Sequence, residues 1–472
     1  MGAVGLFSIF NIARTAFFAN QRSLAVTGQN LANVNTPGYS RQQVILSETL
    51  AQSNTPGQIG TGVQVDQIRR VVDTLVETQL NVSHSTLGRL DVFSRGLSQL
   101  QGLFGDSQDR GIGVALSDFF KAAQDVATNP TDLTARSVLI NRGNALAGLL
   151  NAADTDLNNQ RRSLDRQLSQ TVTDANSLIT KIADLNVKIS SAEGGGGAGS
   201  RDNANDLRDQ RQRLLNDLST LLDVTYLEDA TGQLSVFAGK GLVLVSKGDY
   251  KQLVATANAG NGGLRDVQYD PGNGGTPFTI NSVISQGKLR GYLTLRDTTI
   301  PGLITSLDTL TSSLVGQVNT VHAAGYGLDG VTARNFFTPT GTTSGTISVA
   351  ISDARHVAAS STVEGLPGNN VQALALGALQ NTALAALGSL TMGDYYGRTA
   401  ADLGVTTQGS QRDLVAQETI HENLEQQRGS VSGVSVDEEM INLLKHQRAF
   451  DASARMITIT NEMFETLLNM TR

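Results

Sequence analysis

Residues 435–470 read SVDEEMINLLKHQRAFDASARMITITNEMFETLLNM, without Gly or Pro and with apolar side chains that repeat every seven residues. This spacing places the apolar side chains along one stripe of an α-helix. Ser435 and Glu438 form a capping-box pattern, and the acidic residues after Val436 suit the positive end of a helix. A helix over 436–472 would span more than about 50 Å. Its stripe must be covered by its own domain or by a coiled-coil partner, and the regular spacing favours the coiled coil.

A second long stripe lies near the other end of the chain. Phe10, Phe17, Leu24 and Leu31 are spaced by seven and predict a helix over roughly 5–33 that ends before Pro37. Because the two longest stripes stand at opposite chain ends, we expect a terminal coiled coil, within one chain or between chains. The candidate assembly interface consists of stripe residues from both helices: Phe10, Phe17, Leu24, Leu31, Val436, Met440, Leu443, Phe450, Ile457, Phe464 and Leu468.

The middle of the chain alternates between helical and strand periodicity. Short alternating runs cut by Gly, Asn and Asp from 224 to 284 predict β-structure, and the Thr/Gly/Ser-rich stretch 331–365 predicts short strands. Gly194–Gly197 separates two striped helices, which predicts an antiparallel helical hairpin. The expected helices are 71–104, shorter ones over 114–150 broken at Asn129-Pro130, then 152–192, 202–222, 301–324, 370–390 and 408–430.

These patterns predict a mainly α fold with an inserted β region, in an elongated multi-domain protein with a long-helix bundle. The expected domains are a terminal coiled coil of 1–70 and 433–472, a helical middle domain of 71–227, 286–330 and 366–432, and a β-rich outer domain of 228–285, alone or with 331–365.

The composition excludes several classes of function. The 472 residues include no Cys, which rules out disulfides, thiolate metal sites and a cysteine nucleophile. The net charge of −7 disfavours nucleic acid as a partner. No run of 18 apolar residues is present, so no membrane-spanning segment is expected. The apolar residues 2–13 lack a preceding Lys or Arg and a following Ala-x-Ala site, so we expect no cleaved secretory signal.

No residue pattern indicates an enzyme. His421 begins a segment similar to a zinc-protease helix, but Glu425 stands where the second histidine is required. The segment is therefore interpreted as a solvated helix face, and we expect no catalytic, cofactor-binding or metal site. The alternative is an enzyme or adhesin whose middle domain carries polar side chains converging on a pocket in 228–285 or 331–365.

Both chain ends resemble the signatures of bacterial flagellar rod, hook and hook-associated proteins. Residues 23–42, SLAVTGQNLANVNTPGYSRQ, resemble the N-terminal signature, and Ser-Gly-Val at 432–434 with Asp-Glu-Glu-Met at 437–440 resembles the C-terminal one. The combination of Ser-Gly-Val with Asp-Glu-Glu-Met is most similar to hook-associated proteins. Phe450 stands where the family more often has Tyr. Residues 206–211 are also similar to a helix of that family. The signature residues are Asn30, Asn33, Asn35, Thr36, Pro37, Gly38, Tyr39, Gly433, Asp437, Glu438 and Glu439.

The resemblance implies a structural, non-enzymatic component of the hook–filament junction, with the terminal helices lining an inner tube. It implies an extracellular location in the flagellum, reached by type III flagellar export without a cleaved signal. The implied partners are further copies in a ring or helical tube, the hook protein, a second junction protein (hook-associated protein 3), and an export chaperone on the C-terminal helix. It implies no cofactor, nucleic acid or membrane insertion. The alternative within the family is a hook or distal rod protein.

Overall fold

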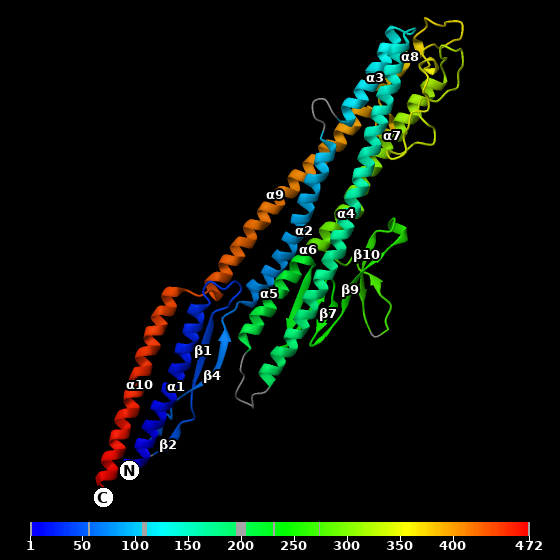
Figure 1. The fold of residues 1–472 in the computed structure, drawn as a ribbon. Helices are drawn as coiled ribbons and strands as arrows, with labels where there is room; N and C mark the ends of the chain where they lie inside the picture. Colours follow the sequence, from blue (N-terminus) through cyan, green and yellow to red (C-terminus); the bar gives the residue numbers. More distant parts are fainter. Residues whose placement is uncertain are drawn as a thin grey trace.

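The computed structural model describes residues 2–54, 57–105, 111–194, 204–229, 232–272 and 274–470. The molecule is an elongated rod of long helices, with both termini at one end and irregular loops at the other (Figure 1). None of the described helices combines the length and apolarity needed to cross a membrane.

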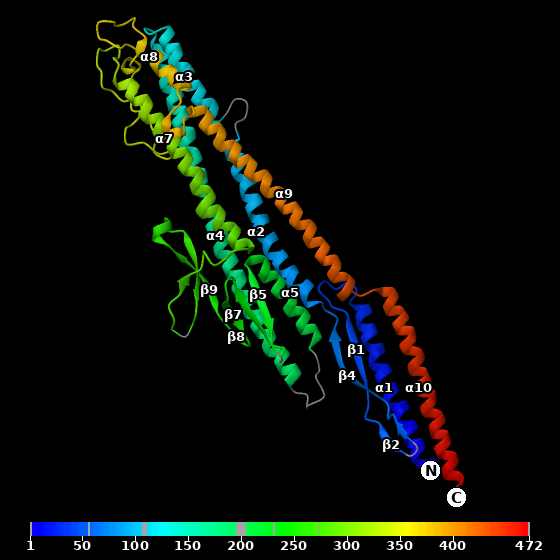
Figure 2. The same ribbon diagram turned by 180° about the vertical axis from the view of Figure 1, so that it is seen from behind.

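The two terminal helices pack against each other within one chain. α1 (Gly2–Ala32) and α10 (Val436–Met470) run antiparallel, which confirms the predicted pairing (Figure 2). A bulged antiparallel ladder of β1 (Gln42–Glu48) and β4 (Val63–Arg70) lies along α1. The smaller pair β2 (Gln52–Asn54) and β3 (Gly57–Ile59) extends it. We refer to α1, β1–β4 and α10 as the terminal unit.

The remaining helices form a long shaft beyond the terminal unit. Asp73 caps the first of them by accepting hydrogen bonds from the backbone N–H groups of Leu75 and Val76, at 2.9 and 3.3 Å. The shaft contains α2 (Thr74–Phe104), α3 (Ile112–Thr128), α4 (Leu133–Gly194), α5 (Asn205–Leu221), α6 (Gly287–Thr294), α7 (Ile300–Ala323), α8 (Val371–Ala378) and α9 (Met392–Ser432).

The longest helix, α4, corrects the prediction of separate helices over 114–150 and 152–192. The break at Asn129-Pro130 is present, but the chain then continues as one helix of 62 residues, about 93 Å long. No Pro follows Pro130 within this helix, Gly148 is accommodated in it, and the buried stripe runs on through Leu146, Leu150 and Leu157. Residues 195–203, which include most of the predicted glycine loop and the expected start of the next helix, lie outside the described residues.

The helices predicted over 370–390 and 408–430 also differ from the structure. α8 ends at Ala378 and short 3₁₀ turns follow, whereas α9 begins at Met392, sixteen residues earlier than expected. The Thr391 hydroxyl caps α9 by accepting from the Asp394 N–H at 3.1 Å. Glycine disfavours helix, but packing along α2 supports α9 through the glycines that it contains.

The β region forms two small antiparallel sheets whose core includes helix residues. Apolar side chains of the sheets pack with Leu168 and Ile179 of α4 and Leu215 of α5. The predicted β-structure is confirmed, but it shares a core with the helical hairpin. One sheet has the strand order β5 (Val224–Glu228), β6 (Leu234–Ala238), β7 (Leu242–Ser246) and β8 (Asp249–Tyr250). The other has the order β11 (Phe278–Thr279), β10 (Arg265–Asp270) and β9 (Gln252–Ala257).

Residues 331–365 do not join the β region. In the described structure this stretch contains isolated bridges, such as Phe337 to Val349, in place of the predicted strands. Phe336 and Phe337 are fully buried and stack edge to face on each other and on the helical core. Backbone groups here bond within loops because Thr, Gly and Ser favour turns over ladders.

A buried ion pair links the α6–α7 connection to α4. Residues Leu295–Thr299 form a π-helical turn, and Arg296 within it is fully buried. Its guanidinium lies 2.8 Å from the carboxylate of Asp165 and 2.7 Å from that of Asp297. The two carboxylates compensate the charge of the guanidinium, whose burial without a partner would be strongly unfavourable.

Candidate functional site: the elbow and the terminal helix pair

Two chain segments meet where the terminal unit joins the shaft. Residues 30–42 lead from α1 into β1, and residues 432–439 lead from α9 into α10. The N–H of Arg41 donates to the carbonyl of Ser432 at 2.8 Å, so the two connections lie side by side. We call residues 30–42 and 432–439 together the elbow.

The centre of the elbow is Asn30, which is buried and uses both ends of its amide. Its Oδ1 accepts from the Tyr39 hydroxyl and from the Gln42 N–H, both at 2.9 Å. Its Nδ2 donates to the Gln42 carbonyl at 2.9 Å and to the Glu439 carboxylate at 3.2 Å. Only an amide supplies two donors and an acceptor from one short side chain, which explains why Asn occupies this position.

Glu439 connects the elbow to α10. Its carboxylate is buried and receives the Arg41 Nε–H at 2.9 Å as well as the Asn30 amide. Arg41 also contacts the exposed Glu438, at 3.2 Å. Burial and the carboxylates around it raise the pKa of the Tyr39 hydroxyl above its ordinary value, so this group stays protonated and donates. The acidic side chains in the first turn of α10 therefore interact with Arg41 and Asn30 as well as with the helix dipole.

The elbow is also fastened to α5 of the shaft. The Asp209 carboxylate accepts from the Ser40 N–H at 3.0 Å and pairs with Arg70 at 2.8 Å. The Arg213 guanidinium donates to the Pro37 carbonyl at 2.9 Å. Gly38 next to it has φ +74°, a left-handed conformation that favours glycine, and an added Cβ would lie 2.6 Å from Arg213 Cδ.

The structure brings together part of the signature predicted from the sequence. Asn30, Tyr39, Glu438 and Glu439 meet in one network, and Pro37 and Gly38 dock on α5. Thr36 bonds locally to Asn33 at 3.1 Å. Asn35 and Asp437 are exposed, and Gly433 ends α9 where an added Cβ would collide with the Gly429 carbonyl.

Sequence reasoning missed the partners that complete the network: Arg41, Arg70, Asp209 and Arg213. Two of them lie in segments that resembled the family, Arg41 in 23–42 and Asp209 in 206–211, and this resemblance was the available signal.

Part of the predicted stripe packs inside the chain, between α1 and α10. The rings of Phe17 and Phe450 lie 4.4 Å apart between centroids, and Phe464 lies 5.0 Å from Phe7, which the predicted interface does not include. Five further residues of the predicted interface are partly buried: Phe10, Leu24, Leu31, Leu443 and Ile457. Val436, Met440 and Leu468 are exposed.

A set of apolar residues on these helices, which includes Met440 of the predicted interface, is exposed to solvent. Ile459 and Met463 are each about half exposed, at 53 % and 50 %. Several large apolar side chains exposed on one pair of helices favour a binding surface. We define the outer face as the exposed residues Phe7, Phe18, Met440, Ile441, Leu444, Met456, Ile459 and Met463.

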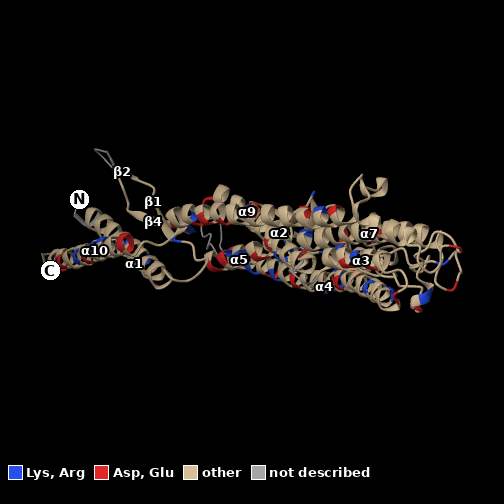
Figure 3. Ribbon diagram, turned by 90° about the horizontal axis from the view of Figure 1, so that it is seen from above, with Lys and Arg blue, Asp and Glu red and all other residues tan. Residues whose placement is uncertain are grey.

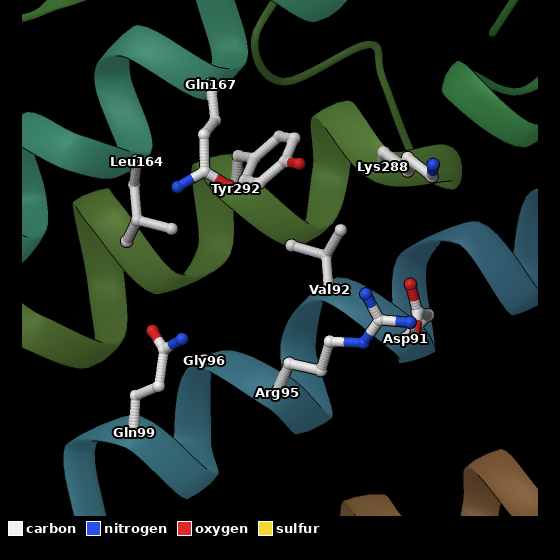
Figure 4. Close-up of a pocket in the computed structure, with 9 residues that line it drawn as sticks. All are labelled: Asp91, Val92, Arg95, Gly96, Gln99, Leu164, Gln167, Lys288 and Tyr292. Atoms are coloured by element: carbon white, nitrogen blue, oxygen red, sulfur yellow. Dashed lines mark ion pairs between the residues drawn. The ribbon is translucent and has the colours of Figure 1, made fainter.

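The pockets along the shaft are open and have both polar and apolar linings. One pocket of about 240 Å³ lies between α2, α4 and α6, with the Asp91–Arg95 ion pair at 2.6 Å on its α2 side and Tyr292 from α6 (Figure 4). Its lining includes no histidine and no hydroxyl activated by a base, so it has the character of a packing groove. Charges of both signs are interspersed along the shaft helices (Figure 3).

Two histidines outside the elbow have well-defined surroundings. His322 is buried, with Nδ1 2.7 Å from the Arg334 carbonyl and Nε2 3.0 Å from the Ala358 N–H, so the neutral ring bridges two loops. Burial lowers the pKa of His322 to about 4. His421 and Glu425, expected on a solvated face, are half-buried and lie beside His84 of α2.

Comparison with known proteins agrees with this architecture. Residues 97–337 match the flagellar hook-associated protein FlgK helical domain. Residues 10–39 match the flagella basal body rod protein family, and residues 425–470 match the flagellar basal body rod FlgEFG protein C-terminal family.

Several known proteins are similar over nearly the whole chain. The flagellar hook-associated protein 1 of Bacillus subtilis is 29% identical over 97% of both chains, and that of Escherichia coli is 23% identical over 98% of this chain and 100% of its own. The fold resembles the flagellar hook junction protein FlgK from Burkholderia pseudomallei, with a TM-score of 0.67 and 18% identity, over 75% of this chain and 100% of that one. Because the helical-domain match spans more than half of the residues, the chain belongs to the flagellar hook-associated protein FlgK family, the structural proteins of the flagellar hook junction.

Proposed function

We propose that the chain connects hook to filament by self-assembly, with copies packing side by side through the outer faces of their terminal helix pairs. Its role is structural, as for the hook-associated proteins that it resembles. The single observation that carries the proposal is the outer face, a set of exposed Met, Ile, Leu and Phe side chains on helices that already have an internal seam.

The outer face gives assembly its driving force. Complete burial of one large apolar side chain contributes about 1.5–3 kcal/mol, so half-exposed residues such as Ile459 and Met463 have much of this still to gain. Neither of the two shaft cores includes residues of α1 or α10 among the described residues. Covering the outer face by another copy therefore leaves the shaft unchanged.

The elbow gives the subunit a defined shape. The network around Asn30 and Glu439, with Asp209 and Arg213 on α5, resists bending between the terminal unit and the shaft. In the proposed assembly the terminal unit, 1–70 and 433–472, lines the inner tube. The helical middle domain and the β-rich region lie further out.

The neighbours that we propose follow from the family resemblance and from the outer face. Hook protein would lie on one side of the ring and hook-associated protein 3 on the other. A flagellar export chaperone would cover the exposed apolar residues of α10 before assembly, because such a surface otherwise aggregates. Export through the flagellar channel would deliver the chain to the outside.

The test in cells is deletion and complementation of the corresponding gene. We expect deletion to leave hooks without filaments and to release filament protein into the medium. Absence of the hooks themselves would instead assign the chain to the hook or distal rod.

The test of the mechanism is a charge on the outer face. Ile459→Asp should abolish filament attachment, because a carboxylate cannot be buried between copies without a partner. The isolated chain should keep its melting temperature because Ile459 is exposed in it. Asn461→Asp, which adds the same charge at an exposed polar position of α10, is the matched control and should still assemble. Equal loss of assembly in both variants would contradict the proposed surface.

A further inference from the structure

Three potential metal ligands meet between α2 and α9, about three turns before α9 ends. The rings of His84 and His421 lie edge to face, with centroids 4.6 Å apart. Glu425 follows His421 by one helical turn and so lies on the same face of α9. One ring nitrogen of each histidine and one Glu425 oxygen all lie within 4.8 Å of one another.

The surroundings of His84 leave a buried nitrogen without a partner. Among the described residues, its Nε2 is shielded from solvent and makes no hydrogen bond. Buried polar atoms are rarely unpaired in folded proteins, so this one requires an explanation. A ring nitrogen that lacks a hydrogen-bond partner can instead bind a metal ion. The neutral imidazole is the form that binds metals.

His421 is oriented by a hydrogen bond at one nitrogen of its ring. Its Nδ1 lies 3.2 Å from the Ser83 hydroxyl, which in turn accepts from the Gln417 side-chain amide at 3.0 Å. A hydroxyl can accept from Nδ1–H, and this tautomer leaves Nε2 free for a cation. Metal-binding histidines commonly have their second nitrogen held in this way.

The nearby charges favour a cation. The Arg428 guanidinium lies 2.8 Å from the Glu77 carboxylate of α2 and farther, at 3.5 Å, from the Glu425 carboxylate. Its closer pairing with Glu77 leaves the Glu425 carboxylate able to turn toward the imidazoles. The two carboxylates and one guanidinium together carry a single negative charge.

We propose that His84, His421 and Glu425 bind Zn²⁺ or a similar transition-metal cation that ties α9 to α2. Bonds of about 2.0–2.2 Å to nitrogen and oxygen would bring the three donor atoms closer together than their present spacing of up to 4.8 Å. Two imidazoles select such a cation over Ca²⁺ or Mg²⁺. The fourth position is left for water. Since α9 leads directly into the elbow, the ion strengthens the shaft next to the terminal unit, independently of the proposed function.

The test is zinc titration of the full-length chain without an affinity tag. Calorimetry should give one ion per chain, and Co²⁺ should produce visible absorption bands typical of nitrogen and oxygen ligands. His84→Gln and His421→Gln should each weaken Zn²⁺ binding by about tenfold or more, which is the minimum effect of disturbing such a site. Zn²⁺ should raise the melting temperature of the original chain and not that of either variant. His356→Gln changes a histidine at the far end of the shaft and should leave binding intact.

Circular dichroism must show unchanged helix content in each variant. If either histidine variant fails to fold, Glu425→Gln replaces it, because this half-exposed side chain can be changed without opening the interior. Zinc binding that is undiminished in the folded variants would overturn the proposal. So would an original chain that binds less than one ion, or binding that disappears in His356→Gln.

Discussion

Replacing Asn30 by Asp tests the centre of the elbow with almost no change in shape. The introduced carboxylate can still accept from the Tyr39 hydroxyl and the Gln42 N–H, but it cannot donate to the Gln42 carbonyl or to Glu439. Each lost hydrogen bond costs about 0.5–1.5 kcal/mol, and more where the partner is charged. Two carboxylates would also face each other where the amide nitrogen and the Glu439 oxygen now lie 3.2 Å apart. We therefore expect a loss of about 3 kcal/mol in the stability of the terminal unit at pH 7.5.

The loss should depend on pH in a defined direction. Burial and Glu439 raise the pKa of the introduced carboxyl group in the folded state above its unfolded value of about 4. The folded variant then binds a proton more tightly than the unfolded one, so the deficit is full above the raised pKa and shrinks as the pH falls. At pH 5 the protonated acid can again donate, and part of the stability should return.

The assay is hydrogen exchange, followed by mass spectrometry, over residues 30–48 and the first turns of α10 at both pH values. Asn33→Asp is the matched control, because Asn33 makes only local hydrogen bonds at the surface and its change should cost less than about 0.5 kcal/mol. Equal exchange in the two variants at pH 7.5, or a deficit that does not change with pH, would refute the reasoning about the elbow.

Three further predictions concern the elbow turn and the shaft. Gly38→Ala should destabilise the terminal unit by about 1–2 kcal/mol because φ is +74°, whereas Gly60→Ala, with no atom within 4 Å of its added Cβ, should have little effect in the same exchange assay. Arg296→Met should lower the free energy of unfolding in urea by about 3 kcal/mol, because it removes the fully buried cation beside Asp165 and leaves this carboxylate paired with the more exposed Arg265; an unchanged midpoint would mean that the Arg296 pair contributes nothing. His322 is neutral when folded and its pKa is about 4, so stability should be full above pH 6.5 and fall by about 3 kcal/mol as the pH drops toward 4; His322→Gln should lose less over that range in urea titrations at several pH values.

The sequence predicts helices best where one apolar stripe continues without punctuation. The spacing of Phe10, Phe17 and Leu24 and that of Leu443 and Phe450 place α1 and α10 within a few residues of their bounds. The errors arise where local signals and packing disagree. The helix predicted over 408–430 begins at Met392 in the structure, where contacts with the shaft stabilise a segment that contains Gly397 and Gly404.

The candidate sites were harder to predict because their residues are distant in sequence. Asn30 and Glu439 are 409 positions apart, and nothing near either residue indicates that they bond. The same holds for His84, which no motif includes and which joins His421 only through the pairing of α2 with α9. Family resemblance identified Asn30 and Glu439 as important without giving their contact.

The antiparallel pairing of α1 with α10 also sets the order in which the molecule can become competent to assemble. The contact of Phe17 with Phe450 closes a loop that contains nearly the whole polypeptide. Such contacts are among those with the largest sequence separation in the fold, and pairings of this kind form slowly. If the chain is delivered starting from either end, the shaft can fold before the second terminal helix is available to pair with the first. The helix pair is complete only when both α1 and α10 are present. A subunit in which one of them is missing therefore cannot yet present the outer face to a neighbouring copy.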